Sequence, residues 1–213
     1  MGLRLMAMFV ALAVSAVGCS SSGTTPTLGE LDGVASRPIP TSGVLGTSVA
    51  DISLPDAANG GEPMSFVGPD GGVLVVYFGY TFCPDVCPTT LSDLRAALGD
   101  LGDDADRVKV AMATIDPVRD TDDVITGYLR SFIEDGHPLR TTDDAELQAA
   151  AGGFGVEYSV IEGVDGNVEV AHSAFLFAVD ESGVIRAVWP FGVEPQTITT
   201  ELRELLGVGS TNS

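Results

Sequence analysis

The sequence predicts an α/β domain, with a mixed central β-sheet and flanking helices. Two patterns carry this prediction. In the middle of the chain, apolar runs of strand length alternate with helix-like repeats, which favours parallel strands joined by right-handed crossovers. Toward the C-terminus, two apolar runs, Ser173 to Val179 and Val184 to Trp189, are separated only by Asp180-Glu181-Ser182-Gly183. So short a turn predicts antiparallel pairing of these two strands.

The other predicted strands are short apolar runs that end at polar or turn residues. The run Val73 to Phe78 is continuous, as expected for a strand that is covered on both faces. A second run, Val108 to Ile115, ends at Asp116-Pro117. Nearer the N-terminus, Val44 to Leu54 alternates as an edge strand or hairpin would, and Asn59-Gly60-Gly61 is a strong turn signal.

The predicted helices carry apolar residues at steps of three and four. The first begins near Thr89, where Leu91, Leu94, Leu98 and Leu101 recur with polar residues between them. Three more helical segments follow, at 122–133, 143–151 and 195–206. After an N-terminal strand or hairpin, the order is β-α-β-α-α-β-β-α, which is the thioredoxin-like arrangement. In such a sheet, chemistry is expected at the carboxyl ends of the strands.

The composition describes a strongly acidic chain that can still build a core. Of its 213 residues, 45% are hydrophobic, and the formal net charge is −20. The length predicts one domain plus appendages. Nucleic-acid binding is not expected, because it requires a basic surface that replaces counterions. The acidic charge is compatible with attraction of cations or of a basic partner, although it also serves solubility alone.

The N-terminal part of the chain is predicted to lie outside the folded domain. Residues 1–18 indicate a signal peptide, with Arg4 near the start and an apolar run that is too short to span a bilayer comfortably. The small residues before Cys19 resemble a bacterial lipoprotein signal, although Ala16 stands where Leu is usual. The resemblance implies lipid on Cys19 and a position on the extracytoplasmic face of the bacterial cell membrane. A plain secretory signal and an uncleaved anchor are the alternatives.

The rest of the chain divides into a tether, one domain and a short tail. Residues 19–42 are rich in Ser, Thr, Gly and Pro, which indicates a flexible tether. The thioredoxin-like domain is expected over residues 43–208, and residues 209–213 are expected to be a disordered tail.

The strongest chemical signal is a pair of cysteines at the predicted strand-to-helix junction. If Cys19 carries lipid, Cys83 and Cys87 are the only thiols of the mature chain, and export would let a disulfide persist. The prolines Pro84 and Pro88 place Cys83 in the loop and Cys87 at the helix N-terminus. The positive end of the helix dipole should then lower the pKa of Cys87.

The four-residue spacing of these cysteines leaves several kinds of site open. It allows a redox-active disulfide, or a dithiol that binds a soft metal such as Cu(I). A purely structural disulfide would gain little, because the loop it closes is so small.

A histidine could complete a metal site and extend it to Cu(II). The chain has two histidines. His172 lies at the start of a predicted strand, in the loop that faces the cysteines in a thioredoxin-like layout, although a histidine there is often only structural. His137 precedes Pro138 and is expected to be a surface turn residue. Met112 is expected to belong to the core.

The sequence closely resembles the Sco/SenC family of copper-binding thioredoxin-like proteins. The resemblance lies in three stretches, Phe78 to Thr89, Thr114 to Thr121, and His172-Ser173-Ala174. It implies copper bound by Cys83, Cys87 and His172, and a role in assembling the dinuclear copper centre of cytochrome c oxidase. It also implies that some members reduce the cysteines of the target.

The leading hypothesis is therefore a lipid-anchored copper metallochaperone. It would carry Cu(I) or Cu(II) to the copper-site subunit of cytochrome c oxidase or to another extracytoplasmic copper protein. Delivery is ligand exchange, so no catalytic residues are predicted and the protein is not expected to be an enzyme. The alternative is a thiol-disulfide oxidoreductase, in which Cys83 and Cys87 are the redox-active pair. A peroxidase-like thiol enzyme is disfavoured, because no arginine is evident beside the thiols.

The segment Asp116 to Asp120, which follows the predicted strand Val108 to Ile115, has two interpretations. It could contact a partner or orient the cysteine segment, or it could simply end the strand. Asp120 or Thr121 is expected to cap the next helix. The role of Asp116 is left open.

Overall fold

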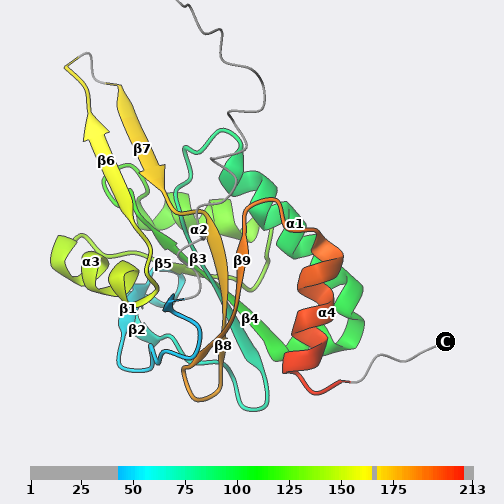
Figure 1. Cartoon of the computed structure of the whole chain (residues 1–213). Helices are drawn as coiled ribbons and strands as arrows, with labels where there is room; N and C mark the ends of the chain where they lie inside the picture. The colour runs from blue at the N-terminus through cyan, green and yellow to red at the C-terminus, as the bar shows by residue number, and fades with distance from the viewer. Residues whose placement is uncertain (1–42, 165–166, 209–213) are drawn as a thin grey trace, which may run out of the picture. The chain divides into compact units, whose positions relative to one another are not determined.

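The computed structural model describes residues 43–164 and 167–208. Figure 1 shows how the elements of this part are arranged. The predicted signal peptide, Cys19, the tether and the C-terminal tail lie outside the described residues. Among the residues that are described, no helix has both the length and the hydrophobicity needed to cross a bilayer.

The core is a mixed sheet of seven strands in the order β2-β1-β5-β4-β3-β8-β9. In that spatial order the strands are Glu62–Ser65, Ser53–Asp56, His137–Leu139, Val108–Thr114, Val73–Gly79, Phe175–Asp180 and Ile185–Pro190. β3, β4 and β5 run parallel, whereas β8 pairs antiparallel with both β3 and β9. The predicted combination of parallel crossovers and a C-terminal hairpin is therefore confirmed.

Helices flank the sheet and connect its strands. They are α1 Val86–Leu101, α2 Asp122–Arg130, α3 Asp144–Gly153 and α4 Pro195–Leu205, with short 3-10 helices η3 Ala57–Asn59 and η4 Gly102–Arg107. α1 and α4 pack side by side (Figure 1), and Oγ1 of Thr199 donates to the carbonyl oxygen of Ala97 at 3.2 Å. The four predicted helices are confirmed, except that α1 begins at Val86 and α2 ends at Arg130.

The centre of the sheet fixes the position of the site. Every residue of β3 is buried, as its continuous apolar run predicts. Met112 of β4 is fully buried, which confirms its place in the core. The ring of Phe154 packs against those of Phe66, Phe78 and Phe177, with centroids 5.0, 5.3 and 5.1 Å away. Burial of so much apolar surface, worth about 25 cal/mol per Å², holds the carboxyl end of β3 in place.

The N-terminal hairpin is displaced from its predicted position. It is formed by β1 and β2 rather than by Val44 to Leu54. In the predicted stretch, an isolated bridge joins Ser48 to Val184. The turn signal Asn59-Gly60-Gly61 is confirmed, because it connects β1 to β2, with Gly60 at a φ of 67° that favours glycine.

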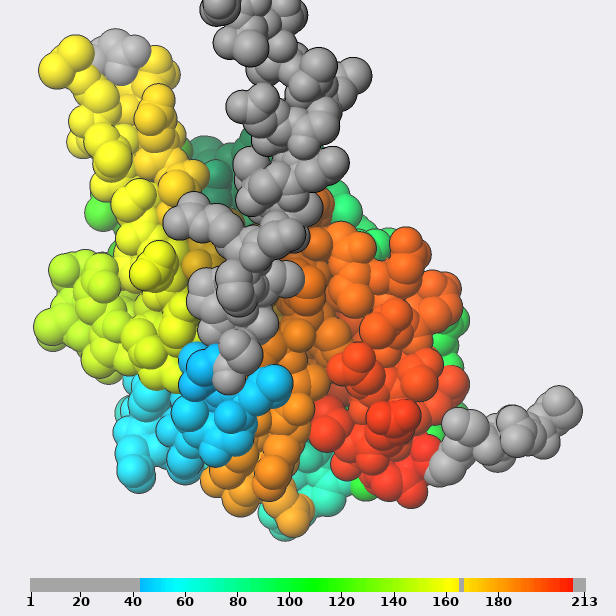
Figure 2. Space-filling view, viewed as in Figure 1, coloured from blue at the N-terminus to red at the C-terminus, as the bar shows by residue number. Residues whose placement is uncertain are grey.

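The sequence does not predict the small second sheet. β6 (Tyr158–Glu162) pairs antiparallel with β7 (Val168–His172). The hairpin projects from the rest of the domain, as the ribbon and the space-filling view both show (Figures 1 and 2). Most of β6 is exposed, so it lacks the apolar pattern of a core strand. His172 is therefore the last residue of β7, and not the first residue of the next strand.

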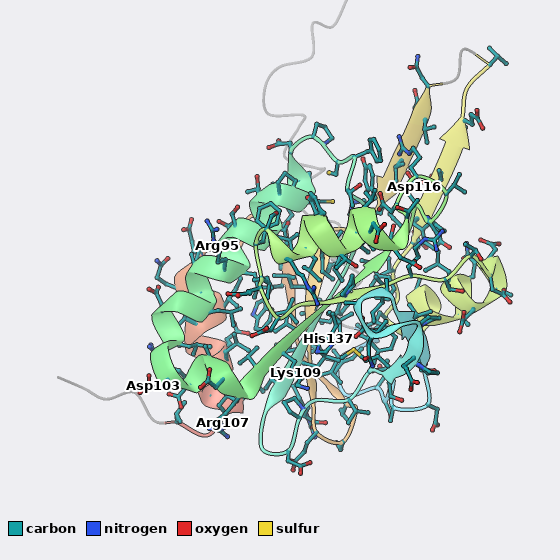
Figure 3. All side chains as sticks on the ribbon, turned by 180° about the vertical axis from the view of Figure 1, so that it is seen from behind. Arg95, Asp103, Arg107, Lys109, Asp116 and His137 are labelled. Carbon is teal, nitrogen blue, oxygen red and sulfur yellow. The ribbon has the colours of Figure 1, made fainter. Side chains whose placement is uncertain are left out.

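His137 is not a surface turn residue, contrary to the prediction. It begins β5 opposite Ala111, and its Nδ1 lies 2.8 Å from Oδ2 of the buried Asp56. This partner lies on β1, far away in the sequence, which is why local polarity gave the wrong assignment. Figure 3 shows His137 apart from Asp116, and its partner Ala111 lies in the middle of β4, so His137 is not at the end of the sheet that carries the cysteines.

Candidate metal centre

The two cysteines follow the carboxyl end of β3, as predicted. Cys83 lies in the cysteine loop (residues 80–85), and Cys87 lies in the first turn of α1. Both are free thiols, with 9% and 0% of their surface exposed. The backbone N–H of Cys87 donates to Sγ of Cys83 at 3.3 Å, whereas the side chain of Asp85 makes no capping hydrogen bond. The Cys83 sulfur thus accepts one of the unpaired N–H groups at the start of the helix.

The helix N-terminus consequently favours the thiolate of Cys83. Burial acts to raise the pKa of Cys83, but the N–H groups of Cys87 and Asp85 donate to its sulfur, and the net result is a pKa below the usual 9.0. Burial raises the pKa of Cys87 to about 12, although the Tyr77 hydroxyl and the Tyr80 backbone donate to its sulfur. The predicted lowering for Cys87 is therefore wrong, because its place in the first turn buries it in the core.

Cys87 is enclosed by the last residues of β3. The hydroxyl of Tyr77, itself fully buried, donates to Sγ of Cys87 at 3.2 Å. A Cβ atom on Gly79 would lie 2.5 Å from the Tyr77 ring and 3.2 Å from Sγ of Cys87. Glycine is therefore needed there for close approach. Neither residue was predicted as part of the site, although both lie on the same face of a strand that leads into it.

His172 approaches Cys87 from the second sheet. Its Nε2 lies 3.9 Å from Sγ of Cys87, and its Nδ1 lies 3.1 Å from the carbonyl oxygen of Ser173. Because a carbonyl can only accept, Nδ1 carries the hydrogen, and the lone pair of Nε2 faces the sulfur. Burial lowers the pKa of His172 below its usual 6.5, which favours the neutral, metal-binding form. The Tyr80 ring packs edge-on against the imidazole.

The three predicted donors lie at one end of the sheet without already forming a closed site. Cys87 is the common neighbour of Cys83 and His172. Within residues 43–164 and 167–208, no three His, Cys, Asp or Glu side chains are grouped closely enough to hold a metal ion. Two sulfurs and a neutral imidazole nevertheless suit a soft ion such as Cu(I).

The Asp116 loop (residues 115–121), between β4 and α2, contacts the cysteine loop through Asp120. The fully buried Asp120 carboxylate accepts hydrogen bonds from the N–H of Thr81 at 3.0 Å, its hydroxyl at 2.5 Å and the hydroxyl of Thr114 at 2.6 Å. Of the two predicted capping candidates, Asp120 is not the cap, because its side chain is turned inward. Thr121 is the cap of α2, as predicted, and accepts from the N–H of Val124.

A second contact between the two loops runs through Asp116 and Arg119. The carboxylate of Asp116, 2% exposed, is paired with Nε of Arg119. The guanidinium of Arg119 lies 4.8 Å from the ring centroid of Phe82 and 6.0 Å from that of Tyr80. Asp116 thus helps to orient the cysteine loop. An arginine does lie next to this loop, which the sequence did not reveal, but it is engaged with a carboxylate and two rings.

The sequence matches a known protein family and several of its members. The SCO1/SenC family model matches residues 57–207. A SCO2-like protein of Rickettsia felis is 32% identical over 118 residues, which covers 53% of this chain and 56% of the relative. The mitochondrial SCO2 protein of Saccharomyces cerevisiae is 34% identical over 131 residues, which covers 58% of this chain and 42% of the relative. The matches thus span about half the length of these relatives.

The fold agrees with a solved structure as well. ScoI of Bradyrhizobium japonicum, solved with copper bound, is 28% identical, with a TM-score of 0.63. The alignment covers 76% of this chain and 99% of that one. The family match includes the cysteine loop, the Asp116 loop and His172. The chain belongs to the SCO1/SenC family.

Proposed function

We propose that this protein is a copper metallochaperone that binds copper through Cys83, Cys87 and His172 and delivers it to the copper centre of cytochrome c oxidase. The observation that carries the proposal is the approach of the unprotonated Nε2 of His172 to Sγ of Cys87, 3.9 Å away. The Ser173 carbonyl fixes the other ring nitrogen, which is how metal-ligating histidines are usually oriented.

The choice of copper as the ion and of cytochrome c oxidase as the partner is based on related proteins. Copper is bound in the solved structure of ScoI from Bradyrhizobium japonicum. The Sco family is linked to cytochrome c oxidase assembly, which supports this partner. Phe82 of the cysteine loop and Val118 of the Asp116 loop expose 57% and 87% of their surface. Exposed apolar side chains of this kind suit contact with another protein.

Copper is cargo in this proposal, so the function depends on ligand exchange. Both thiols must lose their protons to bind, and binding therefore releases protons. Cys83 binds first, because its pKa is lowered and its sulfur is the more accessible. Cys87 binds at a larger proton cost, because burial raises its pKa to about 12.

An anaerobic Cu(I) titration against a chromophoric chelator tests the proposal. The full-length chain would carry Cys19→Ser, so that only Cys83 and Cys87 supply thiols. One Cu(I) per chain is expected, with weaker binding in Cys83→Ser, Cys87→Ser and His172→Ala. His137→Ala is the matched control and should bind normally. The proposal fails if the parent chain binds no copper. Unchanged affinity and Cu(II) spectra in His172→Ala would remove only the third ligand.

A second candidate is thiol-disulfide oxidoreductase activity, which the asymmetry of the two thiols favours. Cys83, with the lowered pKa and 9% of its surface exposed, and Cys87, with the raised pKa and none exposed, suit an attacking and a resolving thiol. The Cys83 thiolate would attack a partner disulfide and release one partner thiolate. Cys87 would then displace the second and form the Cys83–Cys87 disulfide. The reduction potential of the pair tests this, because a strongly oxidising couple could not reduce the partner.

We also propose that lipid on Cys19 anchors the chain at the extracytoplasmic face of the bacterial cell membrane. The support is the signal-like sequence before Cys19. Labelling cells with a radioactive fatty acid should mark the wild-type chain and not Cys19→Ala. Equal labelling of both chains, or of neither, would count against the anchor.

A further inference from the structure

The hydrogen bonds around Asp120 join the Asp116 loop to the cysteine loop just before Cys83. We shall call Asp120, Thr81 and Thr114 the Asp120 network. We propose that Asp120 is a positioning residue, whose carboxylate fixes the backbone at Thr81 and thereby holds Cys83 in the arrangement that receives copper. This inference rests on the proposed function and adds a residue that binds no metal itself.

The burial and partners of Asp120 argue for a specific role. A buried carboxylate is costly unless its oxygens are hydrogen-bonded. Here Oδ1 accepts from the Thr81 hydroxyl, and Oδ2 accepts from the Thr81 N–H and the Thr114 hydroxyl. All three donors are neutral, so the carboxylate contributes acceptor capacity rather than an ion pair. Helix capping does not explain it, because Thr121 already caps α2.

The network reaches both residues that precede Cys83. Thr81 is held directly by Asp120. The hydroxyl of Thr114, which donates to Asp120, also accepts from the N–H of Asp116 at 3.0 Å. Asp116 in turn pairs with Arg119, whose guanidinium lies over the ring of Phe82. The backbone is therefore held at Thr81, and the side chain of Phe82 is held through its ring.

The backbone of Cys83 has few contacts of its own, so its position depends on these anchors. Its N–H makes a long turn contact of 3.4 Å with the carbonyl oxygen of Tyr80. Its sulfur accepts from the N–H groups of Cys87, at 3.3 Å, and of Asp85, both of which come after Cys83 in the chain. When hydrogen bonds already hold a metal-binding side chain in place, less conformational entropy is lost when the metal binds. Loss of the Asp120 network should therefore weaken copper binding.

The test compares two buried carboxylates in the full-length Cys19→Ser chain. Asp120→Ala removes the network, and Asp120→Asn keeps an acceptor for the Thr81 N–H. Asp56→Ala is the matched control: Asp56 is 4% exposed, accepts from the N–H of Ala58 and contacts His137, and it lies on β1, which β5 and β4 separate from β3. Both alanine variants should melt at a lower temperature.

Three measurements separate positioning from stability. Asp120→Ala should bind Cu(I) about tenfold more weakly, the scale typical of residues that support metal ligands. Asp120→Asn should stay within about threefold of the parent chain, and Asp56→Ala should match it. The amide of Thr81 should exchange hydrogen faster in Asp120→Ala only. With glutathione, the Cys83–Cys87 pair should form its disulfide at least threefold more readily in Asp120→Ala, a shift of about 14 mV.

The glutathione measurement does not involve copper. In that reaction the two thiols give two electrons and two protons to glutathione disulfide, which becomes two glutathione thiols. If the parent chain binds no copper, the proposed function fails, and the glutathione equilibrium still decides whether Asp120 positions Cys83.

The inference is overturned if Asp120→Ala melts lower, like Asp56→Ala, but keeps the copper affinity and glutathione equilibrium of the parent chain. If Asp120→Ala does not fold, Thr81→Val replaces it, because it removes one hydroxyl from a half-buried side chain and keeps the N–H. A loss of about threefold in copper affinity is expected for this variant. Unchanged affinity in Thr81→Val would then overturn the inference.

Discussion

Replacing Tyr77 with phenylalanine would remove one buried oxygen atom from the site. The hydroxyl of Tyr77 donates to Sγ of Cys87 at 3.2 Å, and both residues are fully buried. An ionised acceptor holds its donor about twice as strongly as a neutral one. The hydrogen bond therefore favours the thiolate of Cys87, the form that the proposed copper binding requires. The Tyr77→Phe variant should bind Cu(I) more weakly.

The size of this effect follows from the difference between two kinds of hydrogen bond. A hydrogen bond to a charged group contributes about 1.5–3 kcal/mol, and one between neutral groups about 0.5–1.5 kcal/mol. The difference, about 1–1.5 kcal/mol, is lost only in the thiolate form. Since about 1.4 kcal/mol corresponds to a factor of ten, the Cu(I) affinity should fall about five- to tenfold. The free energy of unfolding should fall by about 0.5–1.5 kcal/mol.

Chelator competition at fixed pH measures the affinity, and Tyr128→Phe is the matched control. The Tyr128 hydroxyl is buried and has no hydrogen-bond partner within the described residues. Burial, followed by the charges of Cys87 and Cys83, raises the pKa of Tyr128, so this phenol lies close enough to sense the thiolates. Tyr128→Phe should keep the parent affinity. Equal affinities in the two phenylalanine variants, whether unchanged or lowered, would refute the reasoning.

Three further predictions concern packing, reactivity and acid stability. Gly79→Ala should lower the free energy of unfolding by about 1–3 kcal/mol, because its Cβ would meet the Tyr77 ring; unchanged stability in chemical denaturation would contradict this. Limiting iodoacetamide should alkylate Cys83 before Cys87, because the pKa of Cys83 is lowered and that of Cys87 is raised; mass spectrometry of the two single Cys→Ser variants would detect the reverse order. The third prediction concerns Asp180. Its burial alone would raise the pKa of the carboxyl group, but hydrogen bonds to the carboxylate lower this pKa to about 2, below the ordinary 3.8. The stability that Asp180 contributes is present above pH 4 and lost toward pH 2, so Asp180→Asn should flatten the stability curve between these values.

The elements that pack against the core were predictable, because burial imposes a pattern on their residues. β3 and α1 are examples, with a continuous apolar run and a helical repeat. β5 was missed because it has only three residues and Pro138 is in its centre, and proline argues against a strand. β6 was missed because most of its residues are exposed on both faces, so apolar and polar residues need not alternate along it.

The two thiols could be predicted, whereas the groups that tune them could not. Cys83 and Cys87 are neighbours in the sequence at a recognisable strand-to-helix junction. The depth at which Cys87 is buried depends on β3, and it reverses the pKa expected from the helix dipole. Asp120 and Thr121 are both capping residue types, and only the contact with Thr81, 39 positions away, shows which one is turned inward.

The division of the three donors between two sheets determines how mutations would separate folding from function. Cys83 and Cys87 follow the central strand, so changes that loosen them also loosen the core. His172 ends a two-stranded sheet that projects from the domain (Figure 1). Such a ribbon is only marginally stable by itself, and substitutions in it can misplace the imidazole while the main sheet stays intact. A screen for soluble expression would pass these variants, whereas a screen for the proposed copper binding would reject them.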